Sequence, residues 1–344
     1  VLDLWHARWH PSVTPPSAPT SPRPRPGRGA VARAAVVAST MLLGVVACDL
    51  SRITGSVESG VWSAGTAAHE VTVAGEVRTF HVHVPPKRLT RNSVLAGWPL
   101  VIVLHGSGAD GSDIERATAF DSIADANLFV AAYPDGSRGS FELFPSDWNA
   151  GTCCGGAHRD GIDDIAFIKT MIASVSSKLS IDAHRIYVAG FSAGGRMAYH
   201  VGCRMSTTIA AIAVASGSLV DDACAPGVGV PLIATHGTSD PEVDYGEEAP
   251  PPPRSPTPAA AELPPAVQFW VALGKCTSGK VTPLTAHVAQ AAFTACPGTE
   301  IQFYRIENGT HGWPGGAAEP GSLPPMNEIR FSALAWQFFN RKTR

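Results

Sequence analysis

The chain has 344 residues, of which 44% are hydrophobic and 16% are charged, and its formal net charge is −3. This composition is that of a globular protein, and the length suffices for one large α/β core or two small domains. Because there is no strong basic field, we expect no nucleic-acid partner.

Residues 1–70 differ in composition from the rest of the chain. Residues 11–27 are rich in proline and polar side chains, so they cannot bury a core. Two arginines then precede the short apolar run Ala34–Ala47, a pattern typical of an export signal. The segment Val45–Cys48 is similar to a bacterial lipobox, which makes Cys48 a candidate for lipidation. A plain cleavable signal and an uncleaved anchor are the open alternatives. We expect a secreted or cell-envelope protein that meets the membrane only through this N-terminal anchor.

Residues 71–344 are predicted to form one domain in which strands alternate with helices. A hairpin comes first and turns at Ala74-Gly75, and we interpret His81 and His83 on its second strand as exposed residues rather than metal ligands. Continuous apolar runs follow, as expected of parallel strands covered on both faces. The fold class is therefore α/β, with a mostly parallel central sheet and helices on both faces. We expect strands at 99–104, 128–136, 185–190, 210–218, 230–240 and 300–308, and helices at 112–126, 163–179, 192–205 and 327–342.

Residues 247–265 interrupt this alternation of strands and helices. The segment is of low complexity and rich in proline. Such a composition favours a mobile surface loop over a further element of the sheet.

The cysteines support export. Without Cys48 six remain, and an even number in an exported chain is typical of disulfides. Cys276 and Cys296 bracket one segment and are the expected pair. We expect the adjacent Cys153 and Cys154 to bond not to each other but to the remaining two, in an order that stays open. Because no pair has the spacing of a zinc site, we expect no metal. The six cysteines are Cys153, Cys154, Cys203, Cys224, Cys276 and Cys296.

The stretch Val188–His200, VAGFSAGGRMAYH, places Ser192 between a predicted strand and a predicted helix. G-x-S-x-G in this context is the arrangement of a nucleophile elbow, a sharp strained turn that presents a serine hydroxyl. Gly190 and Gly194 lack the Cβ atoms that would collide where strand and helix cross. The backbone N–H of Ala193 would point at the same place and donate to an oxyanion. The alternative is a structural glycine-rich turn.

A serine nucleophile needs a base, and on this scaffold the acid and then the histidine follow the nucleophile along the chain. Asp240 and His311 each come directly after a predicted strand, at the sheet edge where α/β proteins place their sites. His311 would accept the proton of Ser192, and Asp240 would orient the imidazole. The rival residues are the acids Asp221, Asp222, Glu242 and Asp244, and His158 as the base.

A second oxyanion donor is expected from the loop after an early strand. The segment Leu104–Gly108, LHGSG, is such a loop, and the backbone N–H of Ser107 is the expected donor. The side chain of His105 would then hold the loop.

Seven segments of the chain occur in an informative order: VIVLHGSGADGSDIE, YPDG, WNAGTCC, GIDDIAFIKTMI, RIYVAGFSAGGRMAYH, HGTSDPEVDY and GTHGWPGG. In this order they resemble the esterase/polyhydroxybutyrate depolymerase family, which is similar to carbohydrate esterase family one and to feruloyl and acetylxylan esterases. The resemblance implies an α/β-hydrolase with the triad named above and no cofactor. It also implies that Trp148, Asn149 and Trp313 lie near the substrate cleft, although Trp313 also fits a core aromatic.

These observations predict an exported serine carboxylic-ester hydrolase that works through an acyl-enzyme. The expected substrates are feruloyl or acetyl esters of polysaccharide, or short hydroxyalkanoate esters. Acyl transfer by the same triad and a non-catalytic surface binding protein on a hydrolase scaffold are the alternatives. We expect a monomer.

Overall fold

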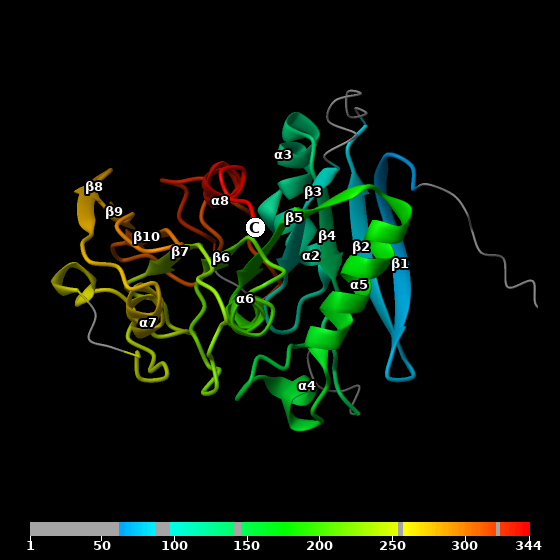
Figure 1. Cartoon of the computed structure of the whole chain (residues 1–344), viewed down its shortest axis with the longest axis horizontal. Coiled ribbons are helices and arrows are strands. Elements are labelled where there is room, and N and C mark those ends of the chain that lie inside the picture. The colour runs from blue at the N-terminus through cyan, green and yellow to red at the C-terminus, as the bar shows by residue number, and fades with distance from the viewer. Residues whose placement is uncertain (1–61, 87–96, 141–145, 254–256, 321–323) are drawn as a thin grey trace, which may run out of the picture. The chain divides into compact units, whose positions relative to one another are not determined.

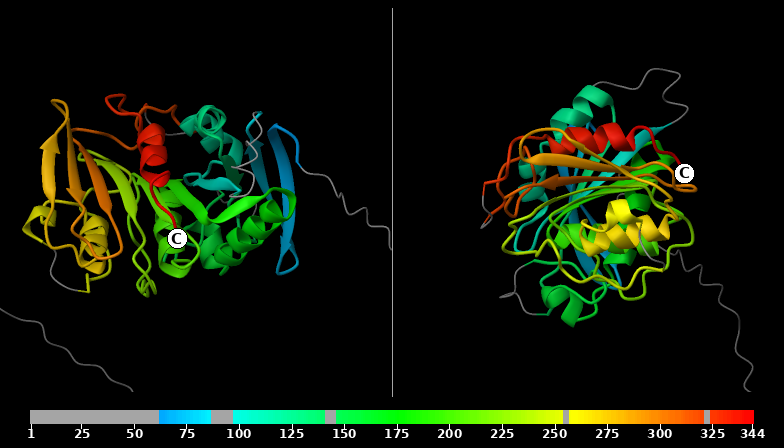
Figure 2. Two further views of the ribbon diagram at one scale, coloured as in Figure 1. Left: turned by 45° about the horizontal axis from the view of Figure 1, so that its top comes forward. Right: turned by 90° about the vertical axis from the view of Figure 1, so that its left-hand side faces the viewer.

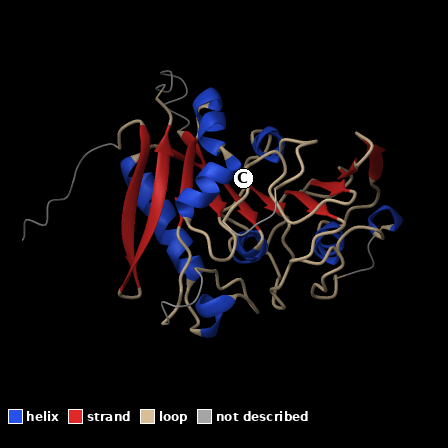
Figure 3. Ribbon diagram, turned by 180° about the vertical axis from the view of Figure 1, so that it is seen from behind, coloured by secondary structure: helices blue, strands red, loops and turns tan. Residues whose placement is uncertain are grey.

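The centre of the fold is one sheet, seen in a computed structural model that describes residues 62–86, 97–140, 146–253, 257–320 and 324–344 (Figure 1). Within these residues ten strands follow in the order β1-β2-β4-β3-β5-β6-β7-β10-β9-β8. The six strands from β4 to β10 run parallel, while β1 and β2 at one edge and β9 and β8 at the other pair antiparallel (Figure 3). The predicted mostly parallel sheet is confirmed. The strands are β1 Gly65–Val73, β2 Glu76–Val84, β3 Trp98–Leu104, β4 Val130–Pro134, β5 Ile181–Phe191, β6 Ala211–Ala215, β7 Leu232–Gly237, β8 Lys280–Pro283, β9 Val288–Phe293 and β10 Ile301–Ile306.

Helices cover both faces of this sheet (Figure 2). Strand β3 shows why, because its side chains are buried on both sides and alternate between two cores. Leu100, Ile102 and Leu104 join the core under α5, α6 and α7, whereas Val101 and Val103 join the core under α2, α3 and α8. Each such side chain contributes about 1.5–3 kcal/mol on burial. The helices are α2 Gly111–Thr118, α3 Phe120–Asn127, α4 Gly155–Arg159, α5 Asp164–Lys178, α6 Ala193–Arg204, α7 Pro265–Leu273 and α8 Phe331–Phe339.

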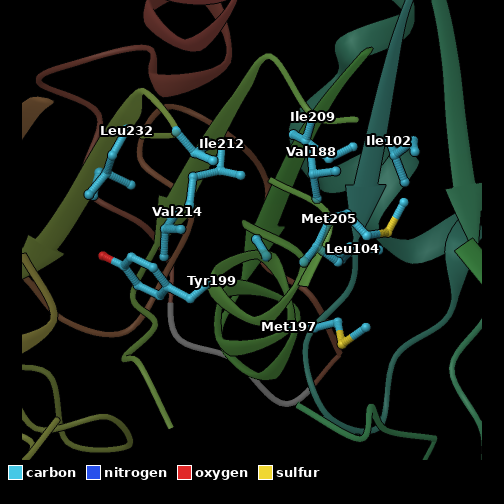
Figure 4. Close-up of a cluster of buried hydrophobic side chains, with 14 of the residues drawn as sticks. Ile102, Leu104, Val188, Met197, Tyr199, Met205, Ile209, Ile212, Val214 and Leu232 are labelled. Atoms are coloured by element: carbon cyan, nitrogen blue, oxygen red, sulfur yellow. The ribbon is translucent and has the colours of Figure 1, made fainter. Parts of the chain in front are cut away.

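Helix α6 packs closely on the middle of the sheet (Figure 4). Its residues Met197 and Tyr199 belong to the same buried cluster as Val188 of β5 and Val214 of β6. At Gly195 the helix approaches so closely that an added Cβ would lie 3.1 Å from a methyl carbon of Val214. The start of α6 is therefore held in place by the core.

Two local predictions need correction. The helix expected over 112–126 is broken at Ala119, whose left-handed backbone (φ 52°) separates α2 from α3. Helices α4 and α7 and the edge strands β8 and β9 were not predicted from the sequence. Helix α7 directly follows the proline-rich segment and begins with Pro265 at its first position, where proline is tolerated. The predicted hairpin is confirmed, with left-handed backbone at both Ala74 and Gly75.

The prediction that both hairpin histidines are exposed is wrong. His83 is buried: its Nδ1 lies 3.0 Å from Thr66 Oγ1 and its Nε2 lies 2.8 Å from Asp125 Oδ1. His81 is half-buried, with its Nδ1 3.6 Å from a carboxylate oxygen of Glu115. Helices α2 and α3 cover this strand, which an alternating pattern alone does not reveal. No group of metal-ligating side chains occurs among the residues that the structure describes.

The disulfides agree only in part with the prediction. Cys276 and Cys296 are paired, as expected. Cys153 and Cys154 are bonded to each other, which corrects the expectation that each bonds elsewhere. The reason lies in the fold, because the end of α6 brings Cys203 to Cys224 with a Cα–Cα distance of 5.1 Å. With Cys276 and Cys296 also paired, this leaves the two adjacent cysteines no other partner among the described cysteines.

The proline-rich segment 247–265, predicted to be a mobile surface loop, packs on the domain at two of its described residues. Ala260, in a short 3-10 turn Pro258–Ala260, is fully buried, and Leu263 is also buried. All described residues belong to one unit, Glu58–Arg344. The candidate export signal and Cys48 lie outside the described residues. No helix in the described ranges is long and apolar enough to cross a membrane.

Candidate active site

Ser192 occupies a sharp turn between the last residue of β5, Phe191, and the first residue of α6, Ala193. Its backbone has φ 55° and ψ −119°, a conformation that costs a non-glycine residue free energy and is found at functional turns. Its N–H donates to the carbonyl of Ala215 at the end of the neighbouring strand β6. The turn therefore has the geometry of a nucleophile elbow.

The two glycines of the G-x-S-x-G motif are required by backbone contacts. A Cβ added to Gly190 would collide with the carbonyl of Gly194, the second residue of α6. A Cβ added to Gly194 would collide with the carbonyl oxygens of Leu104 and His105. The motif thus brings the elbow and the loop after β3 into direct backbone contact.

Asp240 and His311 lie together in loops at the ends of β7 and β10. The imidazole Nδ1 of His311 is 3.0 Å and 2.8 Å from the two carboxylate oxygens of Asp240. Both side chains are almost completely buried. The backbone N–H groups of Glu242 and Val243 also donate to Asp240 Oδ1, at 2.9 and 3.0 Å.

These donors decide the charge state of Asp240. Burial alone would raise the pKa of its carboxyl, but hydrogen bonds from His236, His311 and the two backbone N–H groups outweigh burial. The pKa of Asp240 is thereby held well below its usual range. The carboxylate is ionised at neutral pH and fixes the tautomer of His311 that carries its proton on Nδ1.

The imidazole of His311 lies beside the elbow. Its ring packs against Phe191, the residue before Ser192, with ring centroids 4.8 Å apart. Since Nδ1 bonds Asp240, Nε2 is the nitrogen left for proton exchange. The half-exposed carboxylate of Glu242 lies 3.7 Å from this Nε2.

The loop after β3 is clamped from several directions. Trp148 Nε1 donates to the carbonyl of His105 at 2.9 Å, and His105 Nε2 accepts from the N–H of Gly136 at 2.8 Å. Ser107 Oγ donates to Asp147 at 2.8 Å. Burial lowers the pKa of His105, so this histidine is neutral and structural, as predicted.

The backbone N–H groups of Ser107 and Ala193 form no hydrogen bond within the described part of the chain. One belongs to the clamped loop and the other to the first residue of α6. Both donors therefore remain for an oxyanion.

The residues expected near the substrate cleft are Trp148, Asn149 and Trp313. Trp148 and Trp313 are buried, and Trp313 thus also fits the alternative of a core aromatic. The indole N–H of Trp313 donates to Ser332 Oγ at 2.8 Å, and its ring packs on Phe331. Asn149 is half-buried and its amide donates to the carbonyl of Ile162 at 2.9 Å. The indole N–H groups of Trp148 and Trp313 are both hydrogen-bonded inside the protein, so these side chains stabilise the loops of the site.

Of the rival acids and bases, Glu242 lies near His311 Nε2 rather than Nδ1, and Asp244, Asp221 and His158 have other partners. Asp244 is exposed and accepts from the N–H of Gly246, and Asp221 pairs with His200 and Arg204. His158 is exposed beside Asn149. Neither Asp244 nor Asp221 contacts His311 within the described residues.

Two features near the site escaped the sequence analysis. Arg196 of α6 forms a bidentate pair with Glu247, both bonds 2.8 Å long, and reaches Cys153 Sγ at 3.5 Å. It thus ties the start of the proline-rich segment to the elbow helix. The buried Glu319 accepts from the N–H of Gly106 at 3.1 Å. No sequence signal indicates either contact, because the partners are far apart along the chain.

The chain is similar to known esterases in sequence. Residues 81–245 match the family described as esterase PHB depolymerase. The chain is 32% identical over 171 residues to the bifunctional acetylxylan esterase/xylanase XynS20E of Neocallimastix patriciarum, covering 50% of this chain and 22% of that protein. It is also 32% identical over 152 residues to feruloyl esterase B of Piromyces equi, covering 43% of this chain and 27% of that protein. The alignments thus cover less than a third of either relative's length.

The chain is also similar to a solved structure. The acetyl xylan esterase from Aspergillus awamori superposes with a TM-score of 0.56 at 12% identity, over 80% of this chain and 99% of that chain. The α/β-hydrolase fold and the resemblance to the esterase/polyhydroxybutyrate depolymerase family, both predicted from the sequence, are confirmed. The matched residues 81–245 include Ser107, Ser192 and Asp240, while His311 lies beyond them.

Proposed function

We propose that this chain, an esterase of the α/β-hydrolase type, hydrolyses carboxylic esters with Ser192 as the nucleophile. The observation that carries the proposal is the strained elbow at Ser192 beside the buried pair of Asp240 and His311. A strained serine with an oriented imidazole next to it is the arrangement that activates a hydroxyl group.

The proposed reaction has two halves. In the first, His311 Nε2 takes the proton of Ser192 Oγ while Oγ attacks the ester carbonyl, and the imidazolium then protonates the leaving alcohol. In the second, His311 activates a water molecule, which attacks the acyl-enzyme and releases the carboxylic acid. The ionised Asp240 stabilises the imidazolium in both halves. The N–H groups of Ala193 and Ser107 bind the oxyanion.

The proposed substrates are feruloyl or acetyl esters of polysaccharide, or short hydroxyalkanoate esters. The match to the esterase PHB depolymerase family and the similarity to an acetylxylan esterase and a feruloyl esterase support this choice. We propose that the protein acts as a monomer, with no cofactor and no partner other than its substrate.

We further propose that the protein is exported and is held at the cell envelope through a lipid on Cys48. Three disulfides within the described residues support export, because such bonds persist in oxidising compartments. The lipobox-like segment Val45–Cys48 supports lipidation.

The test is a Ser192→Ala variant assayed on a p-nitrophenyl short-chain ester. We expect kcat to fall by about 10⁶-fold, since the triad acts as a unit. Ser176→Ala is the matched control, because Ser176 is exposed on α5 away from the elbow. Retained turnover in a folded Ser192→Ala variant would contradict the nucleophile assignment.

The substrate class is tested separately with methyl ferulate, acetylated xylan and hydroxybutyrate oligomers. The preferred ester is the one with the highest kcat/KM in the wild-type protein. A wild type that turns over the p-nitrophenyl ester but none of these three would contradict the proposed substrate classes.

A further inference from the structure

Glu319 carries a buried carboxyl group that the proposed mechanism does not use. This group lies against the loop after β3, Leu104–Gly108, which contains the proposed donor Ser107 and which we call the oxyanion loop. Glu319 is 6% exposed, and its Oε2 accepts a hydrogen bond of 3.1 Å from the N–H of Gly106. Gly106 directly precedes Ser107, the proposed oxyanion donor. The other oxygen, Oε1, is buried and has no hydrogen-bond partner within the described residues.

This carboxyl group is close to the nucleophile. A Cβ placed on Gly106 would lie 2.6 Å from Glu319 Oε2 and 3.4 Å from the Cβ of Ser192. Both side chains therefore converge on the same side of Gly106, and no larger residue fits between them. The carboxyl group is near enough for its charge to act on an oxyanion formed at Ser192.

The surroundings of Glu319 favour its neutral form. No cation pairs with it among the described residues, and Asp110 and Asp113 at the start of α2 face it with like charge. Arg116 of α2 is the nearby cation, but it is bonded to Asp113. Burial lowers the pKa of His105 on the oxyanion loop, so this histidine supplies no positive charge.

The active site carries a negative charge of its own, on Asp240. His311, on the loop after β10, is bonded through Nδ1 to the ionised Asp240. The pKa of Glu319 is raised to about 8, chiefly by burial, with the two aspartates adding to the shift and the Gly106 N–H opposing it.

We propose that Glu319 is a positioning residue that works as a neutral carboxyl group, holding the His105-Gly106 peptide and so the adjoining Ser107 N–H for the oxyanion, and that its ionisation sets the alkaline limit of the enzyme. A neutral carboxyl group accepts the Gly106 N–H through its carbonyl oxygen without placing charge in the site. This inference rests on the proposed esterase function.

The expected direction with pH follows from the charges. Below about pH 8 the group is neutral, and the developing oxyanion meets no repulsion from it. Above about pH 8 Glu319 becomes a carboxylate a few ångströms from the oxyanion, which lowers the rate by at least about tenfold. With His311 as the base, such an enzyme would otherwise reach a plateau at alkaline pH.

The experiment compares two variants of the full chain. Glu319→Gln keeps the size and an acceptor oxygen but cannot ionise, and Glu319→Leu removes the acceptor. kcat and KM for a p-nitrophenyl ester are measured between about pH 6 and about pH 10. We expect the wild type to lose activity above about pH 8 and Glu319→Gln to keep it. We expect Glu319→Leu to lose kcat at every pH, because the loop is no longer held.

The control is Glu248→Gln, an exposed glutamate outside the site, which should keep the wild-type profile. An alkaline loss that persists in Glu319→Gln overturns the proposal. So does a loss of kcat at neutral pH in Glu319→Gln as large as in Glu319→Leu, because the amide oxygen then fails to replace the acceptor.

A second readout needs no substrate. If Glu319 is neutral in the folded protein and ionised in the unfolded chain, the wild type is destabilised as pH rises from about 4 to about 8. The Tm of Glu319→Gln should therefore exceed that of the wild type by an amount that grows over this range. A gap independent of pH overturns the neutral carboxyl group. A wild type without esterase activity would contradict the proposed function alone, and this thermal comparison would still decide the state of Glu319.

Discussion

Both carboxylate oxygens of Asp240 lie within hydrogen-bond distance of His311 Nδ1, at 3.0 and 2.8 Å, and both side chains are buried. The two residues are separated by 71 positions along the chain. Parallel neighbouring strands β7 and β10 bring their carboxyl ends, and so the two loops, to the same edge of the sheet.

Asp240→Asn should therefore lower kcat by about 10⁴-fold with little change in fold, because the amide neither fixes the tautomer nor stabilises the imidazolium. Asp244→Asn is the control, since Asp244 is exposed on the same loop and its side chain accepts only the N–H of Gly246 among the described residues. kcat and kcat/KM of both variants are measured on a p-nitrophenyl ester. If Asp244→Asn is the damaging change, Asp240 is not the acid.

Gly194→Ala should destabilise the protein, although alanine is the better helix former by about 1 kcal/mol. The added methyl group would collide with the carbonyl oxygens of Leu104 and His105, and such overpacking costs roughly 1–3 kcal/mol. Urea unfolding measures the change. Gly227→Ala is the control, because its Cβ would meet nothing nearer than 3.9 Å. Equal stability of Gly194→Ala and wild type would refute the close approach.

The double variant Cys203→Ala/Cys224→Ala should lower the free energy of unfolding by about 3 kcal/mol, because the bridge closes a loop with a sequence separation of 21. The comparison with wild type is made under non-oxidising and oxidising conditions. We expect the difference to shrink strongly when the wild type is reduced. A variant as stable as the oxidised wild type would argue against this bridge.

Cys48→Ser in the full chain should release the protein from the membrane fraction of a bacterial host that lipidates exported proteins. The reason is that a thiol is required for the lipid attachment expected at the lipobox-like segment. Fractionation followed by immunoblotting measures the distribution. Unchanged membrane association would remove the lipidation proposal and favour an uncleaved anchor.

The elbow and the sheet could be predicted because their signals are local. Ser192 sits between an apolar strand and a helix with glycines on both sides, and Gly190 and Gly194 can be interpreted from sterics alone. Continuous apolar runs such as Val101–Leu104 indicate strands covered on both faces. Ser192, Asp240 and His311 were chosen because each comes directly after a predicted strand, which is also a local signal.

The remaining features depend on contacts between distant segments. Trp148 and Trp313 are aromatic residues in loops, and their burial depends on segments far away along the chain, such as those of Phe120 and Phe331 around Trp313. The bond between Cys153 and Cys154 follows from the pairing of the other cysteines in space.

Local pattern thus sufficed for the α/β class, the strained serine turn and the strand ends that carry Asp240 and His311, because strand periodicity and turn sterics act over a few residues. Packing had to decide the cysteine partners, the burial of the tryptophans and the approach of Glu319 to Gly106. The last contact joins positions 213 apart, and burial in the folded chain raises the pKa of its carboxyl group.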